Sequence, residues 1–118
     1  MSDRRKLTNR RATTTQKVVI GDAKAYVSTS KFEDGALAEI FVTLHREGSA
    51  FRGLMSTFAI IVSIALQHGV PARVLADAMR GVDFEPNGMV NGDERFSTCT
   101  SIIDYLAQVI EAESGRPV

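Results

Sequence analysis

A polar stretch between two apolar segments, "VDFEPNGMVNGDERF", carries side chains suited to binding a small ligand. Phe84 could stack on a base, Asn87 and Asn91 could bond to base edges, Asp93 could accept hydrogen bonds from ribose hydroxyls, and Arg95 could hold a phosphate. The alternative is local, because Asn-Gly pairs are favoured turn sequences and the aromatic ring could fill the core. Long ordered loops are often functional, so a ligand site and simple turns both stay open.

A second candidate binding region is "HREGSAFRG". Gly48 and Ser49 precede a predicted helix, whose unpaired N–H groups would favour an anion. Arg52 lies in the first turn, where a cation is unfavourable for the helix dipole unless a negative group offsets it. That group could be a bound phosphate or carboxylate, or the side chain of Glu47. The two regions together form the predicted site for a nucleotide-like small molecule.

Residues for covalent or metal chemistry are sparse. The two histidines, His45 and His68, are separated by a whole predicted helix, with no acid at metal-ligand spacing. Cys99 is the only cysteine, which excludes a disulfide framework and a cysteine-rich zinc site. A thiol near a helix start could have a lowered pKa, but free cysteine is commonly buried. We therefore expect no catalytic residue, no metal site and no cofactor.

Charge is unevenly distributed, although the formal net charge of the 118 residues is zero. Residues 1–24 contain seven basic residues and two acidic ones: Arg4, Arg5, Lys6, Arg10, Arg11, Lys17 and Lys24 against Asp3 and Asp22. Residues 1–13 are predicted to be a basic flexible arm, which could bind a polyanion or remain solvated. No signal peptide is expected, and the longest apolar segment, Phe58–Leu66, is too short to span a bilayer, so we expect a cytoplasmic protein without a membrane partner.

The elements that would position these residues begin with three predicted strands. Residues 14–20, 23–32 and 36–44 alternate or are β-branched, with turn signals at Gly21-Asp22 and Glu33–Gly35. Tyr26 lies on the polar face and is the one aromatic residue predicted there. The pattern predicts a three-stranded antiparallel meander.

Three helices are predicted to follow, covering about residues 49–68, 71–80 and 100–114. Ser49 is the predicted N-cap of the first and Gly69 its terminating residue, and Ser101 and Asp104 have capping-box spacing in the third. The first helix has one apolar stripe: Phe51, Leu54, Met55, Phe58, Ile61, Val62, Ala65 and Leu66. The expected fold is a single α+β domain over residues 14–114, with the helices on one face of the sheet and a long loop before the last helix.

Three segments resemble a known family. In order they are "NRRATTTQKVVIGDAKAYVSTSKFEDGALAEIFV", "GSAFRGLMSTFAIIVSIALQHGVP" and "FEPNGMVNGDERFSTCTSIIDYL". Together they resemble the C-terminal domain of adenosylcobalamin-dependent (class II) ribonucleotide reductases, over about residues 8–110. A related domain takes its name from a Thr-Ser-Cys-Pro-Asp motif. Here the corresponding region reads "STCTSIID", so the resemblance is to the longer variant of the domain.

The resemblance implies a nucleotide-related role without turnover. The catalytic barrel with its radical cysteine and cobalamin site is absent from these residues, and so is the C-terminal cysteine pair that re-reduces such an active site. The first hypothesis is a nucleotide-binding homo-oligomer, of the kind phages use as a sponge to sequester cyclic nucleotide or cyclic ADP-ribose signals. The alternatives are an accessory component of a reductase, and nucleic-acid binding through residues 4–17, which the single exposed aromatic disfavours.

Overall fold

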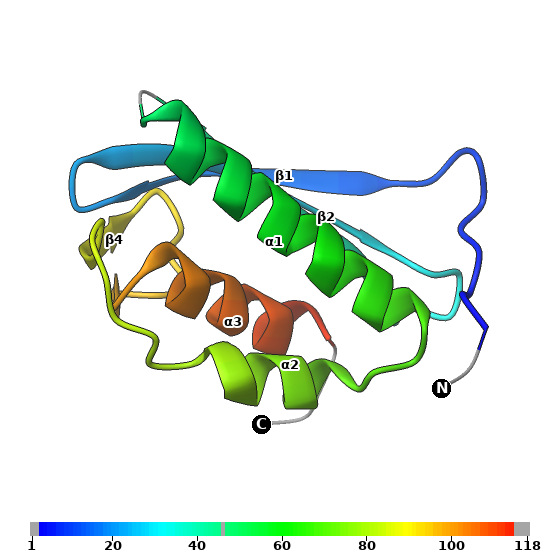
Figure 1. The fold of residues 1–118 in the computed structure, drawn as a ribbon. Coiled ribbons are helices and arrows are strands. Elements are labelled where there is room, and N and C mark those ends of the chain that lie inside the picture. Colours follow the sequence, from blue (N-terminus) through cyan, green and yellow to red (C-terminus); the bar gives the residue numbers. More distant parts are fainter. Residues whose placement is uncertain (1–2, 46, 115–118) are drawn as a thin grey trace.

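The fold is α+β, as predicted, and its sheet has five antiparallel strands in the order β3-β2-β1-β4-β5 (Figure 1). The computed structural model describes residues 3–45 and 47–114. The predicted meander is confirmed, with β1 at Thr13–Ile20, β2 at Ala23–Lys31 and β3 at Leu37–His45. Their alternation buries one face under the helices, with Val18, Ile20, Val27, Ile40 and Val42 in the core.

The prediction of a long loop before the last helix is wrong in one respect, because this segment contains two further strands. β4 is Gly88–Asn91 and pairs with β1, where Ile20 lies opposite Val90; β5 is Thr98–Cys99 and pairs with β4. Both strands are too short to show an alternating pattern. The glycine of the β1–β2 turn makes room for this hairpin: Gly21 has a φ of 61°, and a Cβ there would lie 2.8 Å from the carbonyl oxygen of Asn87.

The helices are α1 at Ser49–Gln67, α2 at Ala72–Met79 and α3 at Ile102–Glu113. In Figure 1, α1 crosses in front of the strands, α3 lies beneath them and α2 lies beneath α3. α3 is the central helix and is buried on most sides, whereas α2 packs mainly on α3 rather than on the sheet. The chain thus places α1 and α3 against the sheet and uses α2 as an outer cover.

Helix ends agree with the sequence at two of three predicted positions. Gly69 has a φ of 91° just after α1, and the Ser101 hydroxyl accepts a hydrogen bond from the Asp104 N–H at the start of α3. The Asp104 carboxylate also accepts from the backbone N–H of Gly81, which ties the end of α2 to α3. The N-cap prediction for α1 is wrong: Gly48 holds that position without a side-chain cap, and Ser49 is the first helical residue.

The face of the sheet opposite the helices is open. Tyr26 lies there as predicted and is 38% exposed. Phe41 is equally exposed on the same face, because it pairs with Ser28, two residues along β2 from Tyr26. The expectation of a single aromatic residue on this face is therefore wrong. The pairing register of β3 with β2 determines which face carries Phe41, and composition alone does not specify that register.

Polar side chains of α1 bind the free edge of β3. The Ser63 hydroxyl accepts from the N–H of Ile40 at 2.9 Å and lies 2.8 Å from its carbonyl oxygen. The Gln67 amide donates to the carbonyl of Ala38, and the Ser56 hydroxyl lies 3.4 Å from the carbonyl of Val42. An edge strand otherwise exposes unpaired backbone groups, so α1 takes the place of a further strand.

Ser63→Ala should lower the free energy of unfolding by about 1–3 kcal/mol, because it leaves the covered N–H and carbonyl of Ile40 without a partner. Thr57→Ala, at an exposed position of the same helix, is the matched control and should change stability by less than about 0.5 kcal/mol. Urea titration followed by circular dichroism measures both. Equal stability of the Ser63→Ala variant and the wild type would show that these hydrogen bonds do not hold α1 to the sheet.

Candidate functional site

Two of the predicted ligand-binding residues, Asp93 and Arg95, bond to each other. Asp93 is only 3% exposed, and the Arg95 guanidinium donates to its two oxygens from Nε at 3.0 Å and from Nη2 at 2.9 Å. The Tyr105 hydroxyl donates to the same carboxylate at 2.7 Å, and Arg95 Nη1 donates to Glu113 at 2.6 Å. Both predicted groups are thus charge-compensated within the chain.

The electrostatics of this cluster favour a permanent ion pair at neutral pH. Burial by itself raises the pKa of Asp93, but the hydrogen bonds from Arg95 and Tyr105 outweigh burial and hold that pKa below its ordinary value. The hydrogen bond to Asp93 raises the pKa of Arg95, and burial followed by the same carboxylate raises the pKa of Tyr105. The cluster joins the end of the β4–β5 hairpin to α3.

Phe84 and the start of α1 meet through an aromatic contact. The rings of Phe51 and Phe84 lie edge to face, with centroids 6.0 Å apart and an interplanar angle of 86°. Phe84 is half-buried, and its N–H donates to the carbonyl of Thr100. The Phe84 ring therefore already packs against Phe51, in agreement with the alternative that this aromatic ring fills the core.

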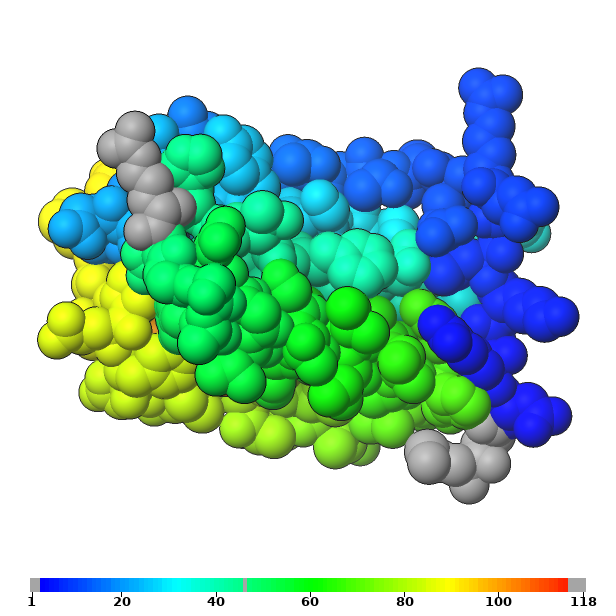
Figure 2. All heavy atoms as spheres, turned by 45° about the horizontal axis from the view of Figure 1, so that its top comes forward, coloured from blue at the N-terminus to red at the C-terminus, as the bar shows by residue number. Residues whose placement is uncertain are grey.

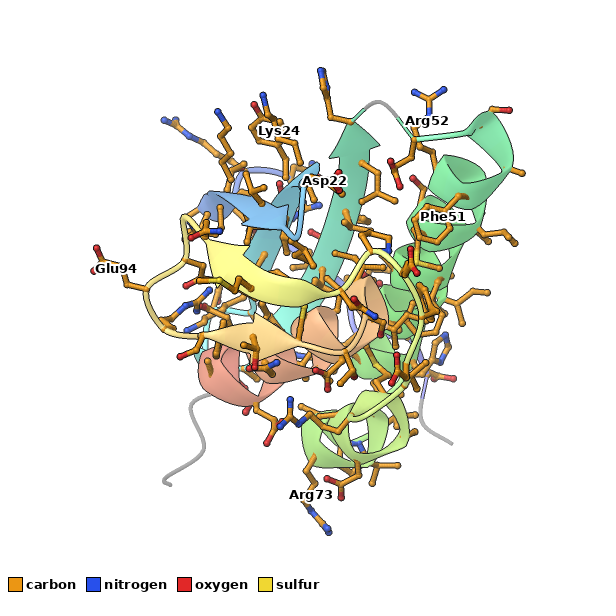
Figure 3. All side chains as sticks on the ribbon, turned by 90° about the vertical axis from the view of Figure 1, so that its left-hand side faces the viewer. Asp22, Lys24, Phe51, Arg52, Arg73 and Glu94 are labelled. Carbon is orange, nitrogen blue, oxygen red and sulfur yellow. The ribbon has the colours of Figure 1, made fainter. Side chains whose placement is uncertain are left out.

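The two predicted binding regions do not form one site. Arg52 projects into solvent at the start of α1 and does not pair with Glu47 (Figure 3). In that view Glu94, next to Asp93 and Arg95, lies on the opposite side of the molecule from Arg52. Gly48 and Ser49 are exposed beside Arg52. The structure brings Phe84 to the helix start and keeps Asp93 and Arg95 apart from it.

The two predicted asparagines lie at the ends of β4. Asn87 precedes the strand, with its carbonyl oxygen against Gly21, and Asn91 ends it opposite Val19. Both side chains are exposed. They are therefore accessible to a ligand.

Cys99 is a buried, protonated thiol. It is 5% exposed, and burial raises its pKa to about 11. The negative charge of Asp104 acts in the same direction, so the nearby helix start does not activate the thiol. In the part of the chain that the structure describes, no three histidine, cysteine or acidic side chains are grouped so that they could hold a metal ion.

The outer face of α1 is the feature that the sequence interpretation missed. Leu54 is 65% and Ile61 60% exposed, although both belong to the stripe predicted to be buried. Ile60 and Ile64 are also exposed, and α1 has no charged residue after Arg52. Figure 2 shows α1, in green, along the surface of the molecule. The sequence did indicate an exposed apolar face, because the helix has more apolar residues than one buried face can hold.

Length and composition alone would allow α1 to cross a membrane. The core helix of a globular domain passes the same test, and α1 buries Met55, Ala59, Val62 and Leu66 against the domain. Its Ser63 and Gln67 side chains bond to β3. We therefore interpret α1 as a core helix whose second face is apolar and uncovered.

Comparison with known proteins relates nearly the whole described chain to one domain. The TSCPD domain family matches residues 3–114, which includes most of the basic arm. A vitamin B12-dependent ribonucleotide reductase of Agrobacterium fabrum is 46% identical over 104 residues, which is 88% of this chain and 8% of the relative. The reductases of Bradyrhizobium diazoefficiens and Rhodopirellula baltica are 44% and 35% identical over 106 residues each, covering 90% and 89% of this chain and 8% and 10% of theirs. No solved structure matches the chain significantly.

Asp93→Asn should destabilise the protein by about 1.5–3 kcal/mol at neutral pH, because it removes charge-assisted hydrogen bonds from Arg95 and Tyr105. A carboxylate with a lowered folded pKa contributes stability above its unfolded pKa of about 3.9, and this stability is lost as the pH falls through the folded value. The variant should therefore lose stability less steeply than the wild type below about pH 5.

Thermal unfolding between neutral and acidic pH measures this difference, and the remaining acid dependence should come in part from Asp104, whose pKa is also held below its ordinary value. Glu94→Gln, at the exposed neighbouring position, is the control and should follow the wild-type profile. An Asp93→Asn protein with wild-type stability and acid profile would show that the ion pair is not structural.

Proposed function

The chain belongs to the TSCPD domain family, and the relatives reported above match it over a small part of a vitamin B12-dependent ribonucleotide reductase. We propose that it is a non-catalytic module that docks onto the body of such a reductase. The observation that carries the proposal is the uncovered apolar face of α1. The chain spans 8% of the length of the first two relatives, so most of each reductase lies outside the segment that matches this chain.

The four exposed aliphatic side chains of α1 supply the contact. Leu54, Ile60, Ile61 and Ile64 lie within about three turns of one helix and are not interrupted by a charge. A contiguous exposed apolar patch marks an interaction site. Full burial of such a side chain contributes about 1.5–3 kcal/mol, and each is already partly covered, so the patch supports modest rather than tight binding.

This modest contact fits a reductase body better than a second copy of the chain. A stable complex of independent proteins buries about 800 Å² on each partner, which is more than one face of one helix offers. Domains of one polypeptide need less, because the linker holds them at high effective concentration. A surface of this size is therefore expected of a domain that works while attached to, or closely alongside, a larger protein.

Leu54→Glu combined with Ile61→Glu should weaken binding to a reductase body about tenfold or more while the domain stays folded, because both positions are mostly exposed but would be buried on docking. The partner is the Agrobacterium fabrum reductase from which the homologous segment has been deleted. Biolayer interferometry measures the affinity, and circular dichroism checks the fold.

The matched control is Val74→Glu combined with Met89→Glu, which places the same charges at exposed apolar positions of α2 and β4. This variant should bind like the wild type. Three outcomes contradict the proposal: no binding of the wild-type domain, equal loss in both variants, or a wild-type homodimer that Leu54→Glu/Ile61→Glu dissociates without any reductase binding.

A further inference from the structure

The basic arm encloses a hollow at the end of the sheet. Residues 5–12, coloured blue in Figure 2, cross this end beside β1 and β2. The hollow between the arm, the strands and the C-terminal end of α3 has a volume of about 670 Å³. Volumes of about 300–1,000 Å³ are typical of small-molecule sites. The arm is therefore a wall of a ligand-sized groove, which we call the arm groove.

Five cationic side chains line the arm groove, and three of them are paired. The ion pairs are Arg5 with Asp34 at 3.0 Å, Arg11 with Glu39 at 3.0 Å, and Lys31 with Glu113 at 3.7 Å. Lys6 and Arg10 also line the groove, and neither has an acidic partner among the residues placed by the structure. Two cations of the arm therefore lack an ion-pair partner, and the one acid of the groove that also lacks a partner is Glu33.

The backbone on both sides of these two cations is held in place. The N–H of Arg5 donates to the carbonyl of Gln67 at the end of α1. The Arg11 guanidinium donates two hydrogen bonds to the Glu39 carboxylate and one to the carbonyl of Thr8. Since the arm is anchored before Lys6 and after Arg10, less conformational entropy is lost when the two cations bind an anion.

We propose that the arm groove binds a compact polyphosphate group, either free or carried by a nucleotide. Lys6 and Arg10 would hold the phosphates, and Thr14 and Thr29, which pair across β1 and β2, line the same groove as further hydrogen-bond partners. This inference is independent of reductase docking, because the groove and the outer face of α1 have no lining residue in common. It places the phosphate-binding residues elsewhere than the sequence predicted.

A compact polyphosphate fits the groove better than a nucleic acid does. Glu33, which has no ion-pair partner among the described residues, also lines the groove and limits the length of polyanion that the groove can accept. The aromatic ring in the groove, Phe32, is already covered by the Arg5 guanidinium at 3.9 Å from its centroid, so base stacking there is blocked. Recognition should therefore depend mainly on the phosphates and discriminate little between bases.

Lys6→Ala combined with Arg10→Ala tests the assignment by isothermal titration calorimetry with ATP, dATP and inorganic tripolyphosphate at low salt. Affinity for all three should fall about tenfold or more, because charge-assisted hydrogen bonds to phosphate are lost, and raising the salt should weaken wild-type binding. The fold should be unaffected, since neither side chain makes an ion pair with the described part of the chain.

Lys17→Ala combined with Lys24→Ala is the matched control, because it removes the same charge from exposed positions of the open sheet face. Its affinity should stay within about twofold of the wild type if binding is local. Equal weakening in both double variants, no wild-type binding of any probe, or displacement of ATP by a short random oligonucleotide of higher affinity would overturn the proposal.

Discussion

The hydrogen bonds between α1 and the outer edge of β3 fix the orientation of the helix, and the accessible surfaces follow from that orientation. The Ser63 hydroxyl accepts from the N–H of Ile40 and lies within hydrogen-bond distance of its carbonyl, and the Gln67 amide donates to the carbonyl of Ala38. At about 100° per residue, Leu54 and Ile61 then lie roughly opposite Ser63 and must face outward. Turning them inward would leave polar backbone groups of the edge strand unpaired, at a cost of about 1–3 kcal/mol for each group.

The same helix end also organises the basic arm. The Gln67 side chain binds Ala38 and accepts from Arg4, while its backbone carbonyl accepts from the N–H of Arg5. One residue therefore connects the sheet edge, α1 and the wall of the arm groove. The proposed docking face and the proposed ligand groove are separate surfaces, but both depend on α1 lying along β3.

The strands and most helix ends could be predicted from the sequence because their signals are local. Alternation identifies β1 to β3. Gly21 adopts a positive φ that glycine favours, and the Ser101 hydroxyl caps a helix N-terminus, so both positions can be recognised from residue type. The short β4 and β5 could not be predicted, because their pairing with β1 is a tertiary property. The site prediction had the same weakness: Asp93 and Arg95 have the right chemistry for a ligand, but Tyr105 and Glu113 complete their bonding from far along the chain. The uncovered face of α1 was missed because a helix that is apolar on most sides does not indicate which side is buried.

The central claim is that the outer face of α1 is where this domain meets a reductase body. A photoreactive group attached at Ile61→Cys tests it directly, since Cys99 is buried with a raised pKa and should not compete for the label. After mixing with the Agrobacterium fabrum reductase that lacks its own homologous segment, illumination should cross-link the labelled domain to the reductase. The same group at Tyr26→Cys, on the open sheet face, should give little product. Cross-linking only from position 26, or only between copies of the domain, would contradict the account.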